Sequence, residues 1–261
     1  MVDRFFGQSG AMELDLMFFA VAIPAVLIAG VSKGGFGSSV GFAAVPLLTL
    51  ILEPVQAAAL MLPLLVVIDF TALKPYWGKW DPRVARILIL GTTVGGFVGA
   101  ALLTVANPDM LRFLIGLLAV GFVAYQIARA RGWLRASDAP MSDRAGLAFS
   151  VVGGFTSFVA HAGGPVTSIY MLSQPLTKLE YQATTVITFW INNMLKLALY
   201  LTLGLLTWQT GLAGLYLMPV AIAGTFLGVY LHRIVPEGLF FTLIYVFLTI
   251  AGTKLVYDAI A

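Results

Sequence analysis

Apolar runs separated by short polar stretches follow one another along the whole chain of 261 residues. Most of these runs reach the roughly 18–25 residues that a helix needs to cross a bilayer. The four shorter ones form two adjacent pairs. The runs are 16–31, 40–52, 55–73, 84–106, 111–128, 145–160, 165–176, 181–203, 211–231 and 238–257. The pattern predicts an all-α, polytopic membrane protein in which each half of the chain carries a broken or re-entrant pair of short helices.

Composition supports the membrane prediction. Hydrophobic residues make up 60% of the chain and charged residues 10%, whereas a soluble domain carries about 25% charged residues. A surface so poor in charge cannot face water, so a soluble protein is excluded. The net charge of +3 is too diffuse to indicate nucleic-acid binding. Because the chain has no cysteine, disulfides, thiolate metal sites and a cysteine-based sulfur relay are excluded, and we expect no metal or cofactor.

The start of the chain does not have the pattern of a removed signal peptide. It contains Arg4 but also Asp3, Glu13 and Asp15, and no small-residue cleavage pattern follows the first apolar run. A signal peptide begins with a basic region instead. We therefore expect 16–31 to be a retained membrane segment.

The second half of the chain repeats the first in the order and lengths of its apolar runs. When the sequence is aligned with itself at one constant shift, Gln56 aligns with Gln182 and Gly37 aligns with Gly163. The polar stretch between the halves is the natural boundary. The predicted organisation is a first membrane repeat (1–130), a cytoplasmic linker (131–144) and a second membrane repeat (145–261).

Lysine and arginine indicate how the repeats are oriented, because cytoplasmic loops carry an excess of both. Loop 74–86 and linker 129–144 each contain four such residues, whereas 204–210, the counterpart of loop 74–86, contains none. The bare loop 104–110 corresponds to 232–237, which contains His232 and Arg233. The charge bias therefore flips between the halves. Since each half has an odd number of segments, we expect an inverted repeat in the cell inner membrane, with both termini periplasmic.

Glycine-rich stretches join the two short pairs: "VSKGGFGSS" at 31–39 and "HAGGPVTS" at 161–168. Irregular backbone at membrane depth survives only where it is buried in protein or lines a polar cavity. Broken helices in corresponding positions of two inverted repeats are typical of a transporter site. Helices starting near Ser38 and Gly164 would direct unpaired N–H groups and positive dipole ends toward the midplane. We therefore expect a cradle for a small oxyanion.

Polar side chains near the breaks are candidates for binding this anion. Lys33 would supply a full positive charge, although it could also snorkel to a membrane surface or pair with Asp69. Ser38 and Ser39 could donate to the oxyanion or cap helices. His161 could contact the substrate or form a hydrogen bond within the core. Each of these alternatives stays open on the sequence alone.

The run 181–203 carries the other polar cluster. Thr188, Asn192 and Lys196 recur every four residues and so share one side of a helix. Asn192 and its neighbour Asn193 could instead hold helices together. Asp69 could be a proton carrier or a static counter-ion of Lys196 or Lys33, and the static role is favoured. The candidate substrate-binding residues are Lys33, Gly34, Gly35, Gly37, Ser38, Ser39, His161, Gly163, Gly164, Thr188, Asn192, Asn193 and Lys196.

This pattern resembles the TauE/SafE family of sulfite exporters over nearly the whole chain. The resemblance rests on two repeats that open with a glycine-rich break, on a short proline-containing segment, "FAAVPLLTLI", and on a helix that begins with "QATTVITF". It implies a transporter that exports sulfite or an organosulfonate such as sulfoacetate. The breaks depart from a plain run of glycines, because the first contains Lys33 and the second contains His161 and Pro165.

Other functions remain alternatives at this point. A passive anion channel of the same fold would need the same cradle. An intramembrane serine hydrolase could use Ser39 or Ser157 with His161, although no G-x-S-x-G motif is present. A scaffold without a substrate would not need a lysine at a broken helix. We expect a non-enzymatic transporter that works by alternating access in the lipid bilayer; its coupling ion (H⁺ or Na⁺) and its oligomeric state stay open.

Overall fold

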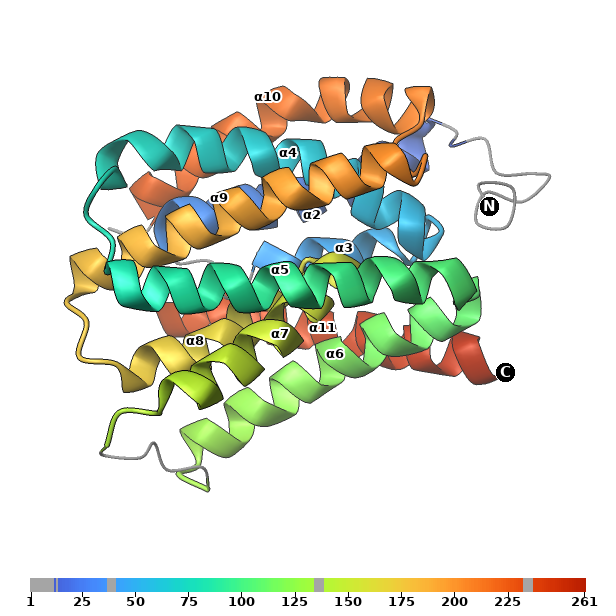
Figure 1. Ribbon diagram of the computed structural model, residues 1–261. Helices are drawn as coiled ribbons and strands as arrows, with labels where there is room; N and C mark the ends of the chain where they lie inside the picture. The colour runs from blue at the N-terminus through green and yellow to red at the C-terminus, as the bar shows by residue number, and fades with distance from the viewer. Residues whose placement is uncertain (1–11, 13, 37–40, 134–138, 232–236) are drawn as a thin grey trace.

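The computed structural model describes residues 12, 14–36, 41–133, 139–231 and 237–261, and within these residues all regular structure is helical (Figure 1). Six of the described helices are long and apolar enough to cross a membrane. This confirms the predicted all-α, polytopic membrane protein. The candidate spans are Leu16–Gly34, Pro54–Tyr76, Pro82–Val105, Pro108–Ala130, Trp208–Gly228 and Phe241–Ile260.

Each predicted apolar run corresponds to helical structure whose ends differ from the predicted ones by a few residues. The first half contains α2 (Leu16–Val31), the π-helical turn η1 (Ser32–Phe36), the 3₁₀ turn η2 (Gly41–Ala43), α3 (Ala44–Leu48), α4 (Pro54–Tyr76), α5 (Pro82–Val105) and α6 (Pro108–Ala130). The second half contains α7 (Asp143–Ala160), α8 (Gly163–Ser173), α9 (Lys178–Thr202), α10 (Trp208–Leu231) and α11 (Glu237–Ile260).

Polar caps and prolines fix where several helices begin. The side chains of Asp81 and Asn107 each accept a hydrogen bond, 2.7 Å long, from the backbone N–H three residues further on. Pro82 and Pro108 then occupy the first helical position, where a proline loses no hydrogen bond because that N–H would be unpaired. These helices therefore begin two or three residues before the apolar runs that predicted them.

The predicted run 40–52 is the one that differs most from its structure. It forms only η2 and the five-residue helix α3, followed by a turn. The predicted helix start near Ser38 falls in 37–40, outside the described residues. In the second half the predicted start near Gly164 lies one residue from the observed start of α8 at Gly163.

Helix α9 is 25 residues long but is not among the six apolar spans. At 1.5 Å per residue it measures about 37 Å, which is enough to cross a hydrocarbon core of about 30 Å. Its buried polar side chains lower its hydropathy. It packs against both α4 and α5, and Figure 1 shows it between them. The polar residues in the middle of α9 are therefore buried against protein.

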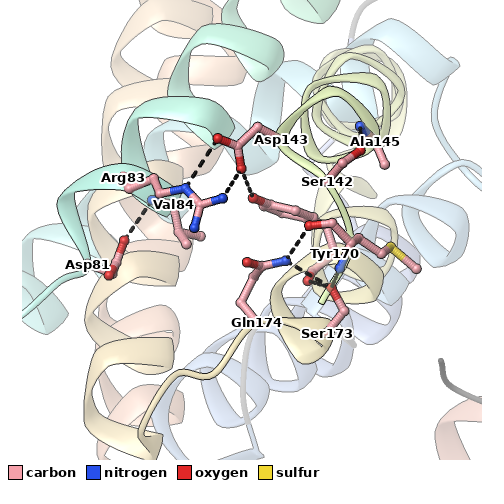
Figure 2. Close-up of polar contacts among 10 residues, drawn as sticks. Asp81, Arg83, Val84, Ser142, Asp143, Ala145, Tyr170, Ser173 and Gln174 are labelled. Carbon is pink, nitrogen blue, oxygen red and sulfur yellow. Dashed lines mark hydrogen bonds and ion pairs between the residues drawn. The ribbon is translucent and has the colours of Figure 1, made fainter. Parts of the chain in front are cut away.

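Helices α7 and α8 pack together as a helical hairpin, the α7–α8 hairpin. The N–H of Met141, just before α7, donates to Ser173 Oγ at the end of α8 over 3.2 Å, and Gln174 Nε2 donates to Met141 O over 3.0 Å. An ion pair between Arg83 and Asp143 ties this base to the start of α5, and Tyr170 points its hydroxyl at the same carboxylate (Figure 2). The two ends of this hairpin therefore lie side by side at one end of the bundle.

Helices α2 and α3, with η1 and η2, form the α2–α3 hairpin, which enters from the opposite end of the bundle. The N–H of Met12 donates to Gln209 Oε1 over 3.4 Å, at the start of α10. After α3 the chain reaches Glu53, whose carboxylate pairs with Arg112 near the start of α6 over 2.7 Å. Figure 1 shows that α6 and α10 both begin at the end away from the α4–α5 loop.

Packing partners recur between the two halves of the chain. Helix α2 packs on α10 as α7 packs on α5, and α4 packs on α10 as α9 packs on α5. Glycines allow a close approach in one such pair: a Cβ added at Gly95 would lie 2.0 Å from the carbonyl oxygen of Val151 in α7. The division into repeats 1–130 and 145–261 and the inverted relation between them stay predictions.

Candidate functional site

The tips of the two hairpins meet around a small internal cavity, which we call the hairpin cavity. The α2–α3 hairpin contributes one wall, the α7–α8 hairpin a second, and α4 and α9 close the remainder. The described lining residues are Lys33, Gly41, Phe42, Leu65, Ser157, His161, Gly164, Phe189, Asn193 and Lys196. Two lysines and a histidine in one cavity of a membrane protein indicate a functional site, because intramembrane ionisable residues are costly.

Lys196 is almost completely buried, with 1% of its surface exposed. Its Nζ atom lies 3.2 Å from Ser157 O, 3.1 Å from Ser157 Oγ and 2.7 Å from His161 Nδ1. These three acceptors match the three N–H groups of an ammonium. None of the ion pairs formed by described residues includes Lys196. The ammonium is therefore hydrogen-bonded, but its charge has no carboxylate partner.

His161 ends α7 in the left-handed conformation, with φ 53°. Its Nε2 lies 2.9 Å from the carbonyl oxygen of Ala58 in α4. A carbonyl can only accept, so the hydrogen-bond network assigns the ring proton to Nε2 and leaves Nδ1 to accept from Lys196. Residues other than glycine with positive φ are uncommon and often mark functional sites. Here contacts from α4 and α9 hold the ring in place.

Lys33 and Asp69 form the second charged element of the site. Lys33 lies on the π-helical turn η1, and its ammonium pairs with one carboxylate oxygen of Asp69 in α4. Asn193 in α9 donates to the other oxygen of that carboxylate. The side chains of Lys33 and Asp69 are 13% and 5% exposed, so the pair is largely shielded from solvent. Of the alternatives left open by the sequence, the structure shows pairing of Asp69 with Lys33.

A second small cavity, which we call the vestibule, lies on the other side of this ion pair. Both cavities are lined by Lys33 and Phe189. The other residues of the vestibule are Asp69, Ala72, Gln182, Thr185 and Val186, which come from the carboxyl end of α4 and the amino half of α9. Figure 1 shows that the carboxyl end of α4 and the amino end of α9 lie at the end of the bundle that carries the α4–α5 loop. The lining residues therefore place the vestibule toward that end.

The structure brings together five of the predicted substrate-binding residues as described lining of the hairpin cavity. They are Lys33, His161, Gly164, Asn193 and Lys196. Gly163 adjoins them at the start of α8, where an added Cβ would lie 2.6 Å from Gly153 O. Gly35 lies in η1 beside Lys33. The predictions for Gly37, Ser38 and Ser39 fall outside the described residues.

Other predicted residues lie away from the described lining. Gly34 packs against α10, since a Cβ there would be 2.1 Å from the carbonyl oxygen of Thr225. Asn192 Nδ2 donates to Ser157 Oγ over 2.9 Å and so supports the serine that contacts Lys196. Thr188 Oγ1 and Asn192 Oδ1 are buried without a hydrogen-bond partner among the described residues. The polar stripe therefore divides: Lys196 faces the hairpin cavity, while Asn192 and Thr188 lie behind its lining.

Several lining residues were not predicted. Phe42, Leu65 and Phe189 are apolar, and nothing in an apolar run distinguishes a residue that lines a cavity from one that packs in the core. Ser157 does carry a signal, because it precedes His161 by four residues and therefore shares its face of the helix. The sequence suggested this pair only as parts of a hydrolase.

The hydrogen bonds of His161 argue against that hydrolase. A catalytic histidine must accept the proton of its nucleophile through a ring nitrogen. Both ring nitrogens are engaged elsewhere, one with Ala58 O and the other with Lys196 Nζ. Ser157 Oγ receives its hydrogen bonds from Asn192 and Lys196. The arrangement holds a cation and does not activate a nucleophile.

A polytopic helical bundle with two helical hairpins around a cationic cavity has the architecture of a membrane transport protein. The chain matches the family model of the sulfite exporter TauE/SafE over residues 22–255. It belongs to this family, whose members are membrane exporters of sulfite and related sulfur anions and not enzymes. No curated protein and no solved structure matches the chain.

Proposed function

We propose that this protein exports a small sulfur-containing anion, either sulfite or an organosulfonate such as sulfoacetate, by alternating access, and that the anion binds in the hairpin cavity. The observation that carries the proposal is the buried ammonium of Lys196, which has hydrogen-bond acceptors but no carboxylate partner. An uncompensated charge in a membrane interior is costly. A bound anion would offset that cost, so the apo site is suited to an anionic ligand.

Backbone groups at the tip of the α7–α8 hairpin would complete the site. The first-turn N–H groups of α8 have no acceptor within their own helix. The N-cap residue, Ala162, offers no side-chain cap, and Pro165 has no N–H, so Gly163 and Gly164 carry the free donors. Gly164 lines the hairpin cavity. Oxyanions bind well at such helix starts because N–H groups and the positive dipole end act together.

Alternating access is supported by the arrangement of the hairpins and the two cavities. The hairpins enter from opposite ends of the bundle, so a shift of one against the other would open the hairpin cavity to opposite sides. The vestibule reaches toward the α4–α5 loop, whose basic residues place it in the cytoplasm under the positive-inside rule. The anion would therefore enter from the cytoplasm, pass Lys33 and Phe189, and leave through the opposite side of the membrane.

Counterflow in liposomes tests this function. Purified protein would be reconstituted with unlabelled sulfite inside, and uptake of labelled sulfite would be followed under imposed proton and sodium gradients. A transporter gives a transient accumulation of label above equilibrium, and the gradient that changes it identifies the coupling ion. A passive channel gives equilibration without overshoot. Absence of any anion flux, in protein that retains its thermal unfolding transition, would contradict the proposal.

A further inference from the structure

We propose that the hairpin cavity is matched to singly charged oxoanions, and that Asp69 sets this preference by cancelling the charge of Lys33. The inference rests on the proposed function and narrows it. Among sulfur anions it favours hydrogensulfite and simple sulfonates over sulfate and over sulfonates that also carry a carboxylate, such as sulfoacetate. It follows from the charges gathered around the cavity.

The first part of the charge count is the Lys33–Asp69 pair, which sums to zero. The ammonium of Lys33 contacts one carboxylate oxygen, and the amide of Asn193 donates to the other. Both oxygens of Asp69 therefore accept hydrogen bonds, as an ionised carboxylate does. The pair offers a ligand hydrogen-bond donors but no net charge.

The second part is the Lys196–His161 pair, which holds at most one positive charge. His161 Nε2 must carry a proton to donate to Ala58 O, so the line between Nδ1 and Lys196 Nζ, 2.7 Å long, has room for a single proton. If both His161 Nδ1 and the facing position of Lys196 Nζ carried a proton, two N–H donors would point at each other and no hydrogen bond could form. Ser157 O and Ser157 Oγ accept the other two N–H groups of the ammonium.

Helix dipoles change this count little. The α7–α8 hairpin brings the negative carboxyl end of α7 next to the positive amino end of α8, so the two end charges of about half a unit each oppose one another. At the carboxyl end of α7, the carbonyl oxygen of Ser157 already accepts a hydrogen bond from Lys196 Nζ. The free N–H groups of α8 would still form hydrogen bonds with an anion, which are effective at short range.

The described lining of the two cavities contains no carboxylate other than Asp69. The charges of the described lining residues therefore sum to at most one positive charge. A monoanion neutralises this charge. A dianion leaves at least one excess negative charge in a largely buried cavity, where unneutralised charge is unfavourable.

Two matched ligand pairs test the preference by titration calorimetry of the full chain in detergent at constant ionic strength. Methanesulfonate and sulfate are similar tetrahedral oxoanions that differ in charge, as do isethionate and sulfoacetate at a larger size. We expect the monoanion of each pair to bind at least about tenfold more tightly, a difference that calorimetry resolves.

Substitutions test whether Asp69 is the specificity-determining residue. Asp69→Asn raises the net charge of the cavity by one and should move the preference toward sulfate by about tenfold or more. The double variant Lys33→Met with Asp69→Asn restores the original charge and should restore the preference for methanesulfonate. A merely structural role for Asp69 would not produce this reversal and recovery.

The outcomes separate the inference from the proposed function. Tighter binding of the monoanions together with the reversal in Asp69→Asn supports the inference. Equal or tighter binding of sulfate to the unaltered protein overturns it, even if the variants do not fold, and leaves the proposed function standing. Absence of binding by all four anions overturns the inference, whereas the proposed function is overturned only if sulfite counterflow is absent as well.

Discussion

Lys33 and Lys196 lie on opposite walls of one cavity, yet their surroundings differ. Lys33 is neutralised by Asp69, whereas Lys196 is surrounded by Ser157 and His161, which carry no negative charge. Asp69 offsets the free-energy cost of burying the charge of Lys33. For Lys196, a bound anion would offset that cost. Two buried lysines of one cavity can therefore have different roles, and their partners decide which.

Replacing Lys196 should break this comparison most completely. Lys196→Met removes the unneutralised charge and keeps a side chain of similar length, so we expect anion affinity to fall by about a hundredfold or more, as for the loss of a charged hydrogen bond in a dry site. Calorimetric titration with methanesulfonate measures the change. Lys254→Met is the matched control, because Lys254 is exposed and pairs with Asp258 on α11. Affinity retained in Lys196→Met would contradict the assignment.

Replacing Lys33 should mainly lower the stability of the folded protein. Lys33→Ala leaves Asp69 buried without its counter-ion, and breaking a buried ion pair by removing one partner costs about 3–5 kcal/mol. We expect a clear drop in the thermal unfolding temperature. Adding Asp69→Asn to this variant should recover most of the loss, because no carboxylate is then left unpaired. If Lys33→Ala unfolds like the unaltered protein, the ion pair does not stabilise the fold.

Gly34, next to Lys33, tests whether a residue of the glycine-rich break serves helix packing or anion binding. Gly34→Ala places a Cβ against Thr225 O and should cost about 1–3 kcal/mol of stability through overpacking. The folded fraction should bind anions as before. Gly121→Ala, on α6, meets open space within 4 Å and serves as the control. If Gly34→Ala lowered anion affinity without lowering stability, the packing role would be contradicted and Gly34 would be a binding residue, as the sequence predicted.

The backbone of His161 gives the smallest predicted effect. His161→Ala keeps a Cβ in the left-handed conformation, while His161→Gly relieves it, so the glycine variant should unfold at a higher temperature by an amount corresponding to about 1 kcal/mol. Both variants remove the acceptor of Lys196 and should weaken anion binding alike. Equal unfolding temperatures would show that the positive φ carries no strain.

The sequence predicted most of the fold because the relevant signals are local. An apolar run predicts a membrane helix. A capping residue such as Asn107, or a proline such as Pro108, predicts where the helix begins. The α7–α8 hairpin was predicted as a broken pair, but the close approach of its two ends was not. That approach depends on Met141 meeting Ser173 and Gln174, which are more than thirty residues away along the chain.

The site was predicted less completely than the fold. Lys33, His161 and Lys196 could be chosen because a polar residue in an apolar run is conspicuous. Phe189 and Leu65 could not, since apolar residues are expected there whatever they line. The stripe on α9 misled in part: a four-residue spacing places Thr188, Asn192 and Lys196 on one side, but that side is broad enough to face two neighbouring elements.

The sequence by itself determined that this chain is a helical membrane protein with two broken pairs, because hydrophobicity and composition are properties of short stretches and act the same in any fold. Only the tertiary structure decided which lysine Asp69 neutralises and which it leaves charged. Residues 69 and 33 are separated by 36 positions, and Lys196 and His161 by 35. Electrostatic energy depends on distance through space, and the folding of the chain sets that distance.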